Sequence, residues 1–324
     1  MPRWLVVRKV LDCFDEAAVA ELRAPLFAYC YRMLGGADDA EDAVQDTLLR
    51  AWRRRDQFDA RRGSLRQWVF GIAHNRCLDH LRAAPRRTLA MDVSPPARPG
   101  APVGRPVEAQ RWVEPAVDPA DEVARRDTVR LAFIAALQHL SPQQRAAVVL
   151  RDVLGFSAAE AANVLGSSVA SVHSALARAR RALAAARSTA ADRFDPTDAA
   201  QRALLADYVR AFDAHDVPAL AKLLHDDIEM SMPPFAFWAR GRDDVVTLFA
   251  QGGCVGARLV AASEAANATA TFGQYRPGAD GVLEPFGLVL VETRGVRIAA
   301  FHTFLFTAHR FVAFGLPPRL AVGS

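Results

Sequence analysis

The densest set of residues able to do chemistry lies between Ala161 and Ala191, and that chemistry is the binding of a polyanion. This stretch holds no acidic residue. Small or polar side chains come first and arginines follow, in the order Ser168, Ser171, Val172, His173, Ser174, Arg178, Arg180 and Arg181. Small side chains let a helix approach base edges in a DNA major groove, and the cations behind them meet phosphates. The competing interpretation is an alanine-rich helix that packs inside a bundle.

A second basic stretch lies earlier in the chain. Ten arginines fall between Arg53 and Arg87, against three aspartates. From Gln201 onward the charges nearly balance, with eleven basic and twelve acidic residues, and the whole chain has a formal net charge of +4. Two separate basic surfaces on an otherwise neutral chain predict two contacts with a polyanion, although solvated helix faces would explain either one alone.

Residues 15–84 are predicted to be helical throughout. One helix covers Ala20–Leu34 and ends at Gly35, where glycine permits the left-handed turn that closes a helix. Asp38 and Glu41 have the spacing of a capping box for a second helix, which carries an acidic, polar face. A third helix begins near Ser64, with one apolar side and one arginine-rich side.

Residues 85–120 are predicted to be a flexible linker. Eight prolines lie between Pro85 and Pro119, mixed with glycine, alanine and arginine, and the apolar residues show neither the helical nor the strand period. Such a segment buries too little apolar surface to order itself, so we expect a semi-extended tether.

A second helical block is predicted over residues 121–190. Ser141 with Gln144, and Ser157 with Glu160, have the spacing of two helix N-caps, and Gly166 marks a tight turn before a longer basic helix. A short helix, a glycine turn and a basic helix in that order indicate a helix-turn-helix.

The character changes over residues 202–320, where helices come first and strand-like segments follow. The order predicts an α+β domain in which a curved antiparallel sheet wraps around helices. The expected architecture is therefore two all-α domains joined by a linker, followed by an α+β domain.

Both helical blocks resemble parts of one family. Residues Leu140–Arg145 (LSPQQR) and Leu150–Ser157 (LRDVLGFS) resemble region 4 of the extracytoplasmic-function (ECF) subfamily of sigma-70 RNA polymerase sigma factors. Residues Asp39–Thr47 (DAEDAVQDT) and Trp68–Arg76 (WVFGIAHNR) resemble region 2 of the same family. The resemblance implies a protein that binds core RNA polymerase and directs it to promoter −35 and −10 elements.

The resemblance also implies roles for individual residues. The basic helix named first would enter the −35 major groove. The acidic helix would bind core polymerase through Asp39, Asp42, Gln45, Asp46 and Leu49. The −10 element would be held by Arg62, Arg66, His74, Asn75 and Arg76. Taken alone, Asn75 would equally fit a helix cap or a surface amide.

The C-terminal segment resembles a SnoaL-like domain in Ala206–Asp216 (ADYVRAFDAHD), Leu223–Ile228 (LLHDDI) and Pro233–Trp238 (PPFAFW). Such domains form a cone with an apolar pocket. The candidate pocket residues are Met230, Met232, Phe237, Trp238 and His302. A regulatory module that contacts the sigma domains is favoured. An enzyme would need an acid and a base at the cavity; Asp226, Asp227 and His302 could serve, but no spacing in the sequence requires it.

Other features narrow the class of protein. The sequence has no 18-residue apolar run, its N-terminus lacks the pattern of a secretory signal, and its four cysteines lack metal-site spacing. We therefore expect a cytoplasmic protein with no cofactor, no metal and no membrane contact. Its expected partners are core RNA polymerase, at the clamp and flap regions, promoter DNA, and its own C-terminal domain. Two rivals are a conventional repressor or activator and a SnoaL-type enzyme with a DNA-binding appendage.

Overall fold

The chain folds into two compact units. One comprises residues 1–87 and 118–188 and is called the helical unit; the other comprises residues 88–117 and 189–324 and is called the sheet unit. A computed structural model describes residues 16–83, 86–98, 100–108, 111–117, 130–185, 191–192, 194–251, 253–278 and 281–321.

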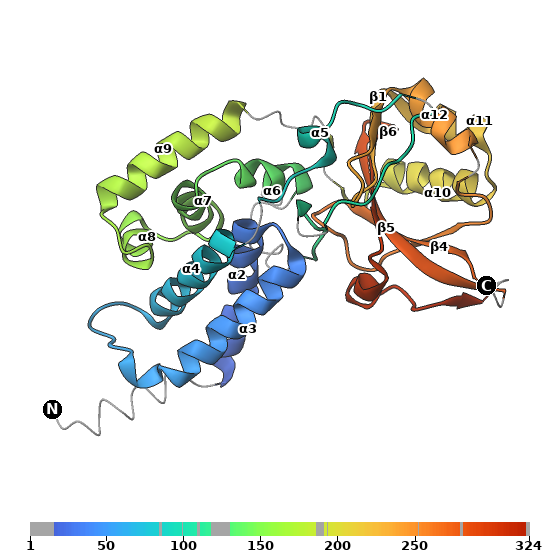
Figure 1. Ribbon diagram of the computed structural model, residues 1–324. Coiled ribbons are helices and arrows are strands. Elements are labelled where there is room, and N and C mark those ends of the chain that lie inside the picture. Colours follow the sequence, from blue (N-terminus) through green and yellow to red (C-terminus); the bar gives the residue numbers. More distant parts are fainter. Residues whose placement is uncertain are drawn as a thin grey trace. The chain divides into compact units, whose positions relative to one another are not determined.

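The first part of the helical unit contains three long helices: α2 (Glu16–Leu34), α3 (Ala37–Arg53) and α4 (Leu65–Ala83) (Figure 1). A short 3₁₀ turn, η1 (Arg55–Gln57), follows α3. Gly35 has a φ of 74°, so the expected glycine termination of α2 is confirmed. The expected capping box at Asp38 is wrong, because α3 begins at Ala37 with Gly36 at its N-cap position, so Asp38 lies inside the helix, and no side chain caps it.

The start of α4 follows the sequence expectation. The Ser64 hydroxyl accepts a hydrogen bond from the Gln67 amide at 3.2 Å, and the Gln67 side chain accepts one from the Ser64 amide at 3.1 Å. This reciprocal pair satisfies two donors that a helix end leaves open. The buried face of α4 contains Val69, Phe70, Ala73 and Cys77.

The second part of the helical unit contains α6 (Leu131–Gln138), α7 (Pro142–Val148), a π-helical turn η4 (Val149–Val153), α8 (Ala158–Val164) and α9 (Val169–Ala185). Both predicted capping boxes are present. The Ser141 hydroxyl accepts from the Gln144 amide, and the Ser157 hydroxyl accepts from the Glu160 amide. Gly166 has a φ of 57° between α8 and α9, so the helix-turn-helix is confirmed.

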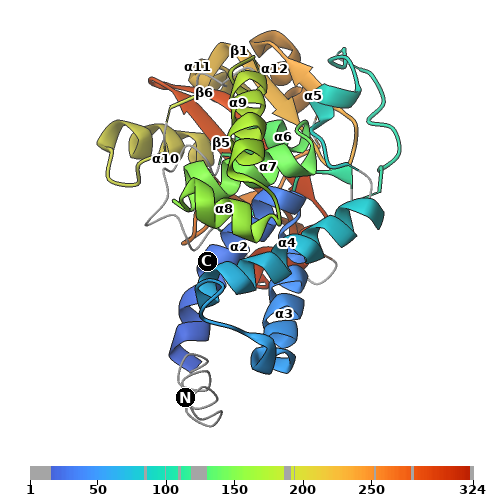
Figure 2. The ribbon, with the colours of Figure 1, turned by 90° about the vertical axis from the view of Figure 1, so that its left-hand side faces the viewer.

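The two parts of the helical unit pack on each other, with α8 against α4 and α7 against α2 (Figure 2). The rings of Phe70 in α4 and Phe156 before α8 meet edge to face at 5.0 Å. The guanidinium of Arg66 lies 4.2 Å above the Phe156 ring and donates to the Leu154 carbonyl at 3.0 Å. Nothing in the local sequence patterns predicts this contact.

The sheet unit contains three main helices: α10 (Ala199–Asp213), α11 (Val217–Leu223) and α12 (Arg242–Ala250). Its strands are β1 (Leu224–Ser231), β2 (Trp238–Arg240), β3 (Arg258–Ala261), β4 (Ala270–Pro277), β5 (Val282–Arg294), β6 (Arg297–Leu305) and β7 (Leu320–Ala321), and a 3₁₀ helix, η5 (Ala308–Phe314), precedes β7. The strand order is β2-β1-β6-β5-β4-β3, with β7 on β5. The α+β prediction is confirmed, and the strand pairs are antiparallel as expected except for β1 and β6, which run parallel.

The sheet has two covered faces. On the inner face, Met230 of β1 and Phe301 of β6 join the main hydrophobic core, where Phe301 stacks on Tyr208 of α10 at 5.1 Å. Successive strand residues point to opposite faces, so the outer face carries the intervening positions. There, Gly273 of β4 lies so close to Phe311 of η5 that an added Cβ would meet that ring at 3.0 Å.

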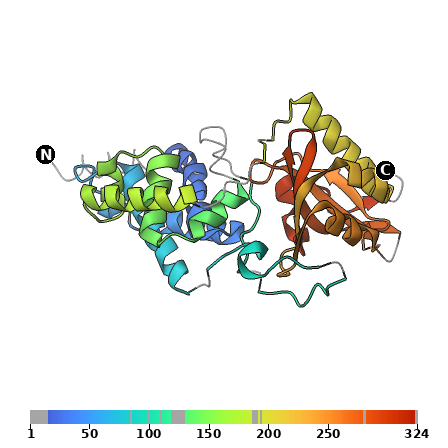
Figure 3. The same ribbon diagram turned by 90° about the horizontal axis from the view of Figure 1, so that it is seen from above.

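The linker differs from the expected free tether. Among its described residues, regular structure is limited to the short helix α5 (Ala90–Val93) and isolated bridges or turns, as its prolines predict. However, Thr88–Val117 belongs to the sheet unit, and the teal chain follows that unit in Figure 3. The Trp238 indole donates to the Ser94 carbonyl at 2.8 Å, and buried Asn267 exchanges two hydrogen bonds with the Ala116 backbone. The sheet unit supplies the partners that the linker lacks by itself.

Among the described residues, no helix is both long enough and apolar enough to span a bilayer. Within the same residues, no group of three His, Cys, Asp or Glu side chains is arranged to hold a metal ion.

Candidate functional site

An acidic groove lies between α3 and α4 in the helical unit. It has a volume of about 340 Å³ and is lined by Asp39, Asp42, Ala43, Gln45, Asp46, Leu49, Arg76 and His80. All five residues that the sequence associates with polymerase binding line this one groove. Leu49 is 47% exposed at its edge, so the groove combines carboxylates with an accessible apolar side chain.

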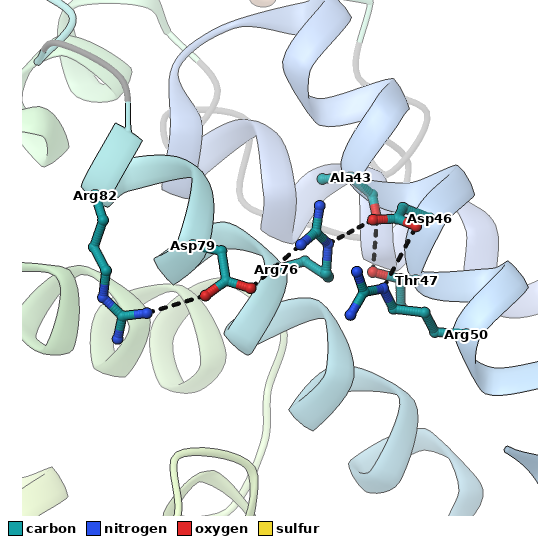
Figure 4. Close-up of polar contacts among 7 residues, drawn as sticks. All are labelled: Ala43, Asp46, Thr47, Arg50, Arg76, Asp79 and Arg82. Atoms are coloured by element: carbon teal, nitrogen blue, oxygen red, sulfur yellow. Dashed lines mark hydrogen bonds and ion pairs between the residues drawn. The ribbon is translucent and has the colours of Figure 1, made fainter.

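A chain of ion pairs ties the groove's floor to α4 (Figure 4). The guanidinium of Arg76 lies 2.6 Å from the Asp46 carboxylate and 3.2 Å from Asp79, which also pairs with Arg82 at 3.0 Å. Arg50 approaches Asp46 from the next turn of α3 at 3.5 Å. The Arg76–Asp46 pair joins α4 to α3 at the groove, and the other pairs lie within one helix or the other and hold these two side chains in place.

Asp39 forms the other end of the groove. Its carboxylate accepts from Arg87 at 2.5 Å and lies 3.2 Å from His80 Nε2. Burial by itself raises the pKa of this carboxyl, but the hydrogen bonds and charges of His80 and Arg87 outweigh burial and lower the pKa to about 2. Asp39 is therefore ionised at every physiological pH.

The predicted −10 residues do not share one environment. Arg62 and Asn75 are exposed, as a nucleic-acid contact requires. Arg66 is held by Phe156 and Leu154, and Arg76 lies in the acidic groove. The guanidinium groups of Arg66 and Arg76 therefore already have protein partners in this structure. Contact of Arg62, Arg66, Asn75 and Arg76 with the −10 element stays a prediction.

The prediction that His74 contacts the −10 element is wrong for this structure. The side chain is only 7% exposed, and its Nδ1 shares a 2.8 Å hydrogen bond with the hydroxyl of buried Tyr29. Burial lowers its pKa to about 4, so the imidazole is neutral at physiological pH. A neutral, buried imidazole is a core residue of the helix pair α2 and α4, and in this structure it is not accessible to a DNA strand.

Most of the predicted −35 residues are exposed to solvent on α9 or at its start. The exposed members are Ser168, His173, Ser174, Arg178, Arg180 and Arg181. Ser171 is half-buried and its hydroxyl accepts from Gln143 at 3.2 Å. Val172 is 1% exposed and packs in the core, so its assignment as a DNA contact is wrong for this structure.

Arg180 differs from its neighbours on α9. Its guanidinium forms a two-point pair with Asp152, at 3.0 and 2.6 Å. This pair joins α9 to the turn before α8. Arg178 and Arg181 are the cations of α9 that have no such carboxylate partner among the described residues.

The predicted ligand pocket is not assembled. Met230, Met232 and Phe237 contribute to the inner core cluster of the sheet unit. His302 and Trp238 are both paired in register with Ser231, so they lie on the opposite, outer face. His302 Nδ1 shares a 2.9 Å hydrogen bond with the Ser231 hydroxyl. Side chains of a β-strand alternate between the two faces of the sheet, so the five residues predicted to line one pocket lie on opposite faces.

Sequence reasoning missed Arg87 and His80, the two partners of Asp39. Both stand more than 40 positions from Asp39 in the sequence, and no local pattern connects them with it. Gly36 is the sequence feature that points to a close contact at this place. Its φ of −116° suits any residue, yet a Cβ there would collide with the Arg87 guanidinium, so the glycine marks a close approach.

The helix-turn-helix and the basic, exposed face of α9 place the chain in the class of DNA-binding proteins. Comparison with known families then identifies the kind. Sigma-70 region 2 matches residues 18–87, and Sigma-70 region 4 matches residues 130–183. The chain belongs to the ECF RNA polymerase sigma factors, which direct RNA polymerase to promoters.

Relatives in Mycobacterium tuberculosis span most of the chain. The ECF RNA polymerase sigma factor SigG of strain H37Rv is 41% identical over 313 residues, which cover 92% of this chain and 82% of that protein. SigJ of the same strain is 31% identical over 81% of this chain and 80% of its own length. The crystal structure of SigJ matches with a TM-score of 0.55 and 24% identity, covering 93% of this chain and 99% of SigJ, which supports the fold.

Proposed function

We propose that the acidic groove between α3 and α4 is the surface that binds core RNA polymerase. The observation that carries this proposal is that Asp39, Asp42, Gln45, Asp46 and Leu49 line one groove. Asp39 and Asp46 already pair with cations of their own chain. Exposed Asp42 and Leu49 are therefore the residues to which a basic, partly apolar surface of the polymerase clamp would bind.

Charge reversal tests the groove. Asp42→Lys should weaken binding of the full chain to purified core enzyme and lower run-off transcription in the same proportion. Glu41→Lys is the matched control, because Glu41 is an equally exposed acid on α3 that does not line the groove. Equal losses for the two variants would show that general charge, rather than the groove, governs binding.

The second part of the proposal is that α9 binds in the major groove of the promoter −35 element. Because promoter DNA lies in the bacterial cytoplasm, we propose that the protein acts there. Exposed Arg178 and Arg181 supply phosphate contacts. Arg178→Ala should reduce the slope of log affinity against log salt by about one. Arg180→Ala serves as the comparison, since Asp152 occupies that guanidinium. An unchanged slope for Arg178→Ala would remove this residue from the DNA interface.

The third part concerns the C-terminal domain, which we propose modulates initiation by holding the linker between the two sigma regions. Its support is the set of hydrogen bonds that join the sheet unit to Ser94, Ala116 and Val107. A linker held along 30 residues restricts how far region 2 and region 4 separate, and both must bind one promoter.

Releasing the linker tests this role without removing the domain. Asn267→Ala deletes the side-chain acceptor for the Ala116 amide, and Ser94→Ala deletes a 2.6 Å bond to the Ala236 carbonyl. The double variant should change promoter output in run-off transcription while core binding stays constant. Thr247→Ala on α12, outside the linker contact, is the control. Unchanged output in the double variant, or turnover of a small molecule by the domain, would overturn the regulatory role.

A further inference from the structure

A second cavity of the helical unit lies where its two parts meet, apart from the acidic groove. It has a volume of about 330 Å³. Its walls come from the end of α4 and the residues that follow, and from the segment that joins α6 to α7. The cavity has the size of a small-molecule site at the lower end of the usual range, about 300 to 1,000 Å³.

The walls of this cavity carry positive charge. Arg86, Arg87 and Arg145 line it together with His80 and His139, and no carboxylate is among the described residues that line it. Arg87 and His80 both pair with the carboxylate of Asp39, which lines the acidic groove and not this cavity. Arg86 and Arg145 remain as the cations of the cavity that no carboxylate in the described part of the chain neutralises.

Arg145 is the most informative of these residues. It is 3% exposed, and its guanidinium donates to the Gln138 side chain at 2.6 Å and to the carbonyls of Gln138, Leu140 and Met33. All of these acceptors are neutral, and the Nε atom is buried with no acceptor. A buried cation without an anion is costly, because protein carbonyls replace its hydration only in part.

The charges of Arg86 and Arg145 also repel each other. Burial is the main cause that lowers the pKa of Arg145, and the nearby charge of Arg86 acts in the same direction; together they bring it to about 10. An anion bound near both guanidinium groups would offset their mutual repulsion and favour the charged form of Arg145.

We propose that this cavity is a binding site for a small molecule carrying one or two phosphate groups. A phosphate group has the charge and the several acceptor oxygens that two guanidinium groups prefer. The ligand would contact Arg86 after α4 and His139 or Arg145 beside α7, so it would hold the two parts of the helical unit together. A ligand that binds only the packed form stabilises that form by mass action.

Titration calorimetry with inorganic pyrophosphate, on the full chain and at constant ionic strength, tests the proposal. The wild type should bind, and Arg86→Ala should bind about tenfold more weakly, because one charge-assisted contact is lost. Arg86 is exposed, so its replacement leaves the core intact. Arg23→Ala, an exposed arginine on α2 away from the cavity, should bind like the wild type. The melting temperature of the wild type should rise with pyrophosphate concentration.

Three results would overturn the proposal. The first is no heat of binding for the wild type at millimolar pyrophosphate. The second is equal weakening by Arg86→Ala and Arg23→Ala, which indicates general charge screening. The third concerns DNA phosphates as the source of the same chemistry: Arg86→Ala weakens binding to a duplex without promoter elements, while pyrophosphate does not bind the wild type. That third result would assign Arg86 to the DNA surface.

Discussion

The contact between Arg66 and Phe156 gives a quantitative test of the packing inside the helical unit. Arg66 lies on the exposed rim of α4, and its guanidinium sits 4.2 Å above a ring that is 1% exposed. It also donates to the Leu154 carbonyl at 3.0 Å. Both partners come from the segment just before α8, so this side chain links region 2 to region 4.

The expected magnitude follows from these two interactions. A cation–π contact at a partly exposed site contributes about 0.5 to 1 kcal/mol, and a hydrogen bond from a charged donor contributes about 1 kcal/mol net at such a site. Arg66→Ala should therefore lower the local free energy of opening by about 1.5 to 2 kcal/mol. The control is Arg62→Ala, which removes an exposed arginine that lies before the helix.

A double-mutant cycle isolates the ring contact. Phe156→Leu keeps an apolar side chain but removes the ring, and its combination with Arg66→Ala should show a coupling energy of about 0.5 to 1 kcal/mol. Native-state hydrogen exchange of α4 and α8 amides in the full chain measures the local opening free energy, which a global melting curve of two units would blur. A coupling energy near zero would refute the reasoning, and so would equal effects of Arg66→Ala and Arg62→Ala.

Three further predictions concern local features. Gly36→Ala should displace Arg87 from its ion pair with Asp39, because the new methyl group collides with the guanidinium, and the melting temperature should fall with a destabilisation of about 1 to 3 kcal/mol. Ser157→Ala should cost about 1 kcal/mol through loss of the α8 N-cap, seen as faster exchange at the Glu160 amide, whereas an unchanged rate would mean that the cap contributes nothing. The pKa of Asp39 in the folded protein is about 2, below the ordinary value of 3.8 for an aspartate, so its contribution to stability is complete above pH 3.8 and is lost as the pH falls toward 2. Asp39→Asn should flatten the acid limb of stability by about 1 kcal/mol after allowance for solvent screening, and an identical acid limb in both proteins would contradict the assignment.

Local chemistry made several elements predictable. Ser141 and Ser157 cap their helices because a hydroxyl two or three residues before open amides needs no distant partner. Gly166 makes its turn for an equally local reason, the freedom of its φ angle. The order of helices and strands also follows from periodicity along the chain, and the family motifs identified the two sigma regions.

Facing positions on one helix were also predictable. Asp39, Asp42 and Asp46 repeat at intervals of three and four residues, so the helical period by itself places them on one side of α3. The same reasoning failed at Val172 and His74, which stand among polar residues but point into the core. The period of α9 and α4 turns these two positions inward, and only the neighbouring helices show which side is inward.

Long-range partners were beyond the sequence. The pairing of Arg87 with Asp39, the seat of Arg66 on Phe156 and the hydrogen bonds of the linker with Asn267 all join segments that are distant along the chain. Their formation depends on how whole helices and strands pack, and no local propensity encodes that.

The sequence by itself therefore determined the class of this protein: helix caps and periodicity predicted the helical blocks and the α+β domain, and the resemblance of two motifs to sigma-70 regions 2 and 4 indicated the family. The tertiary structure alone decided which charges are available to partners and which are used internally. The physical reason is that a charge is assigned to a partner by distance in space, over a few ångströms, whereas the sequence orders residues along a chain.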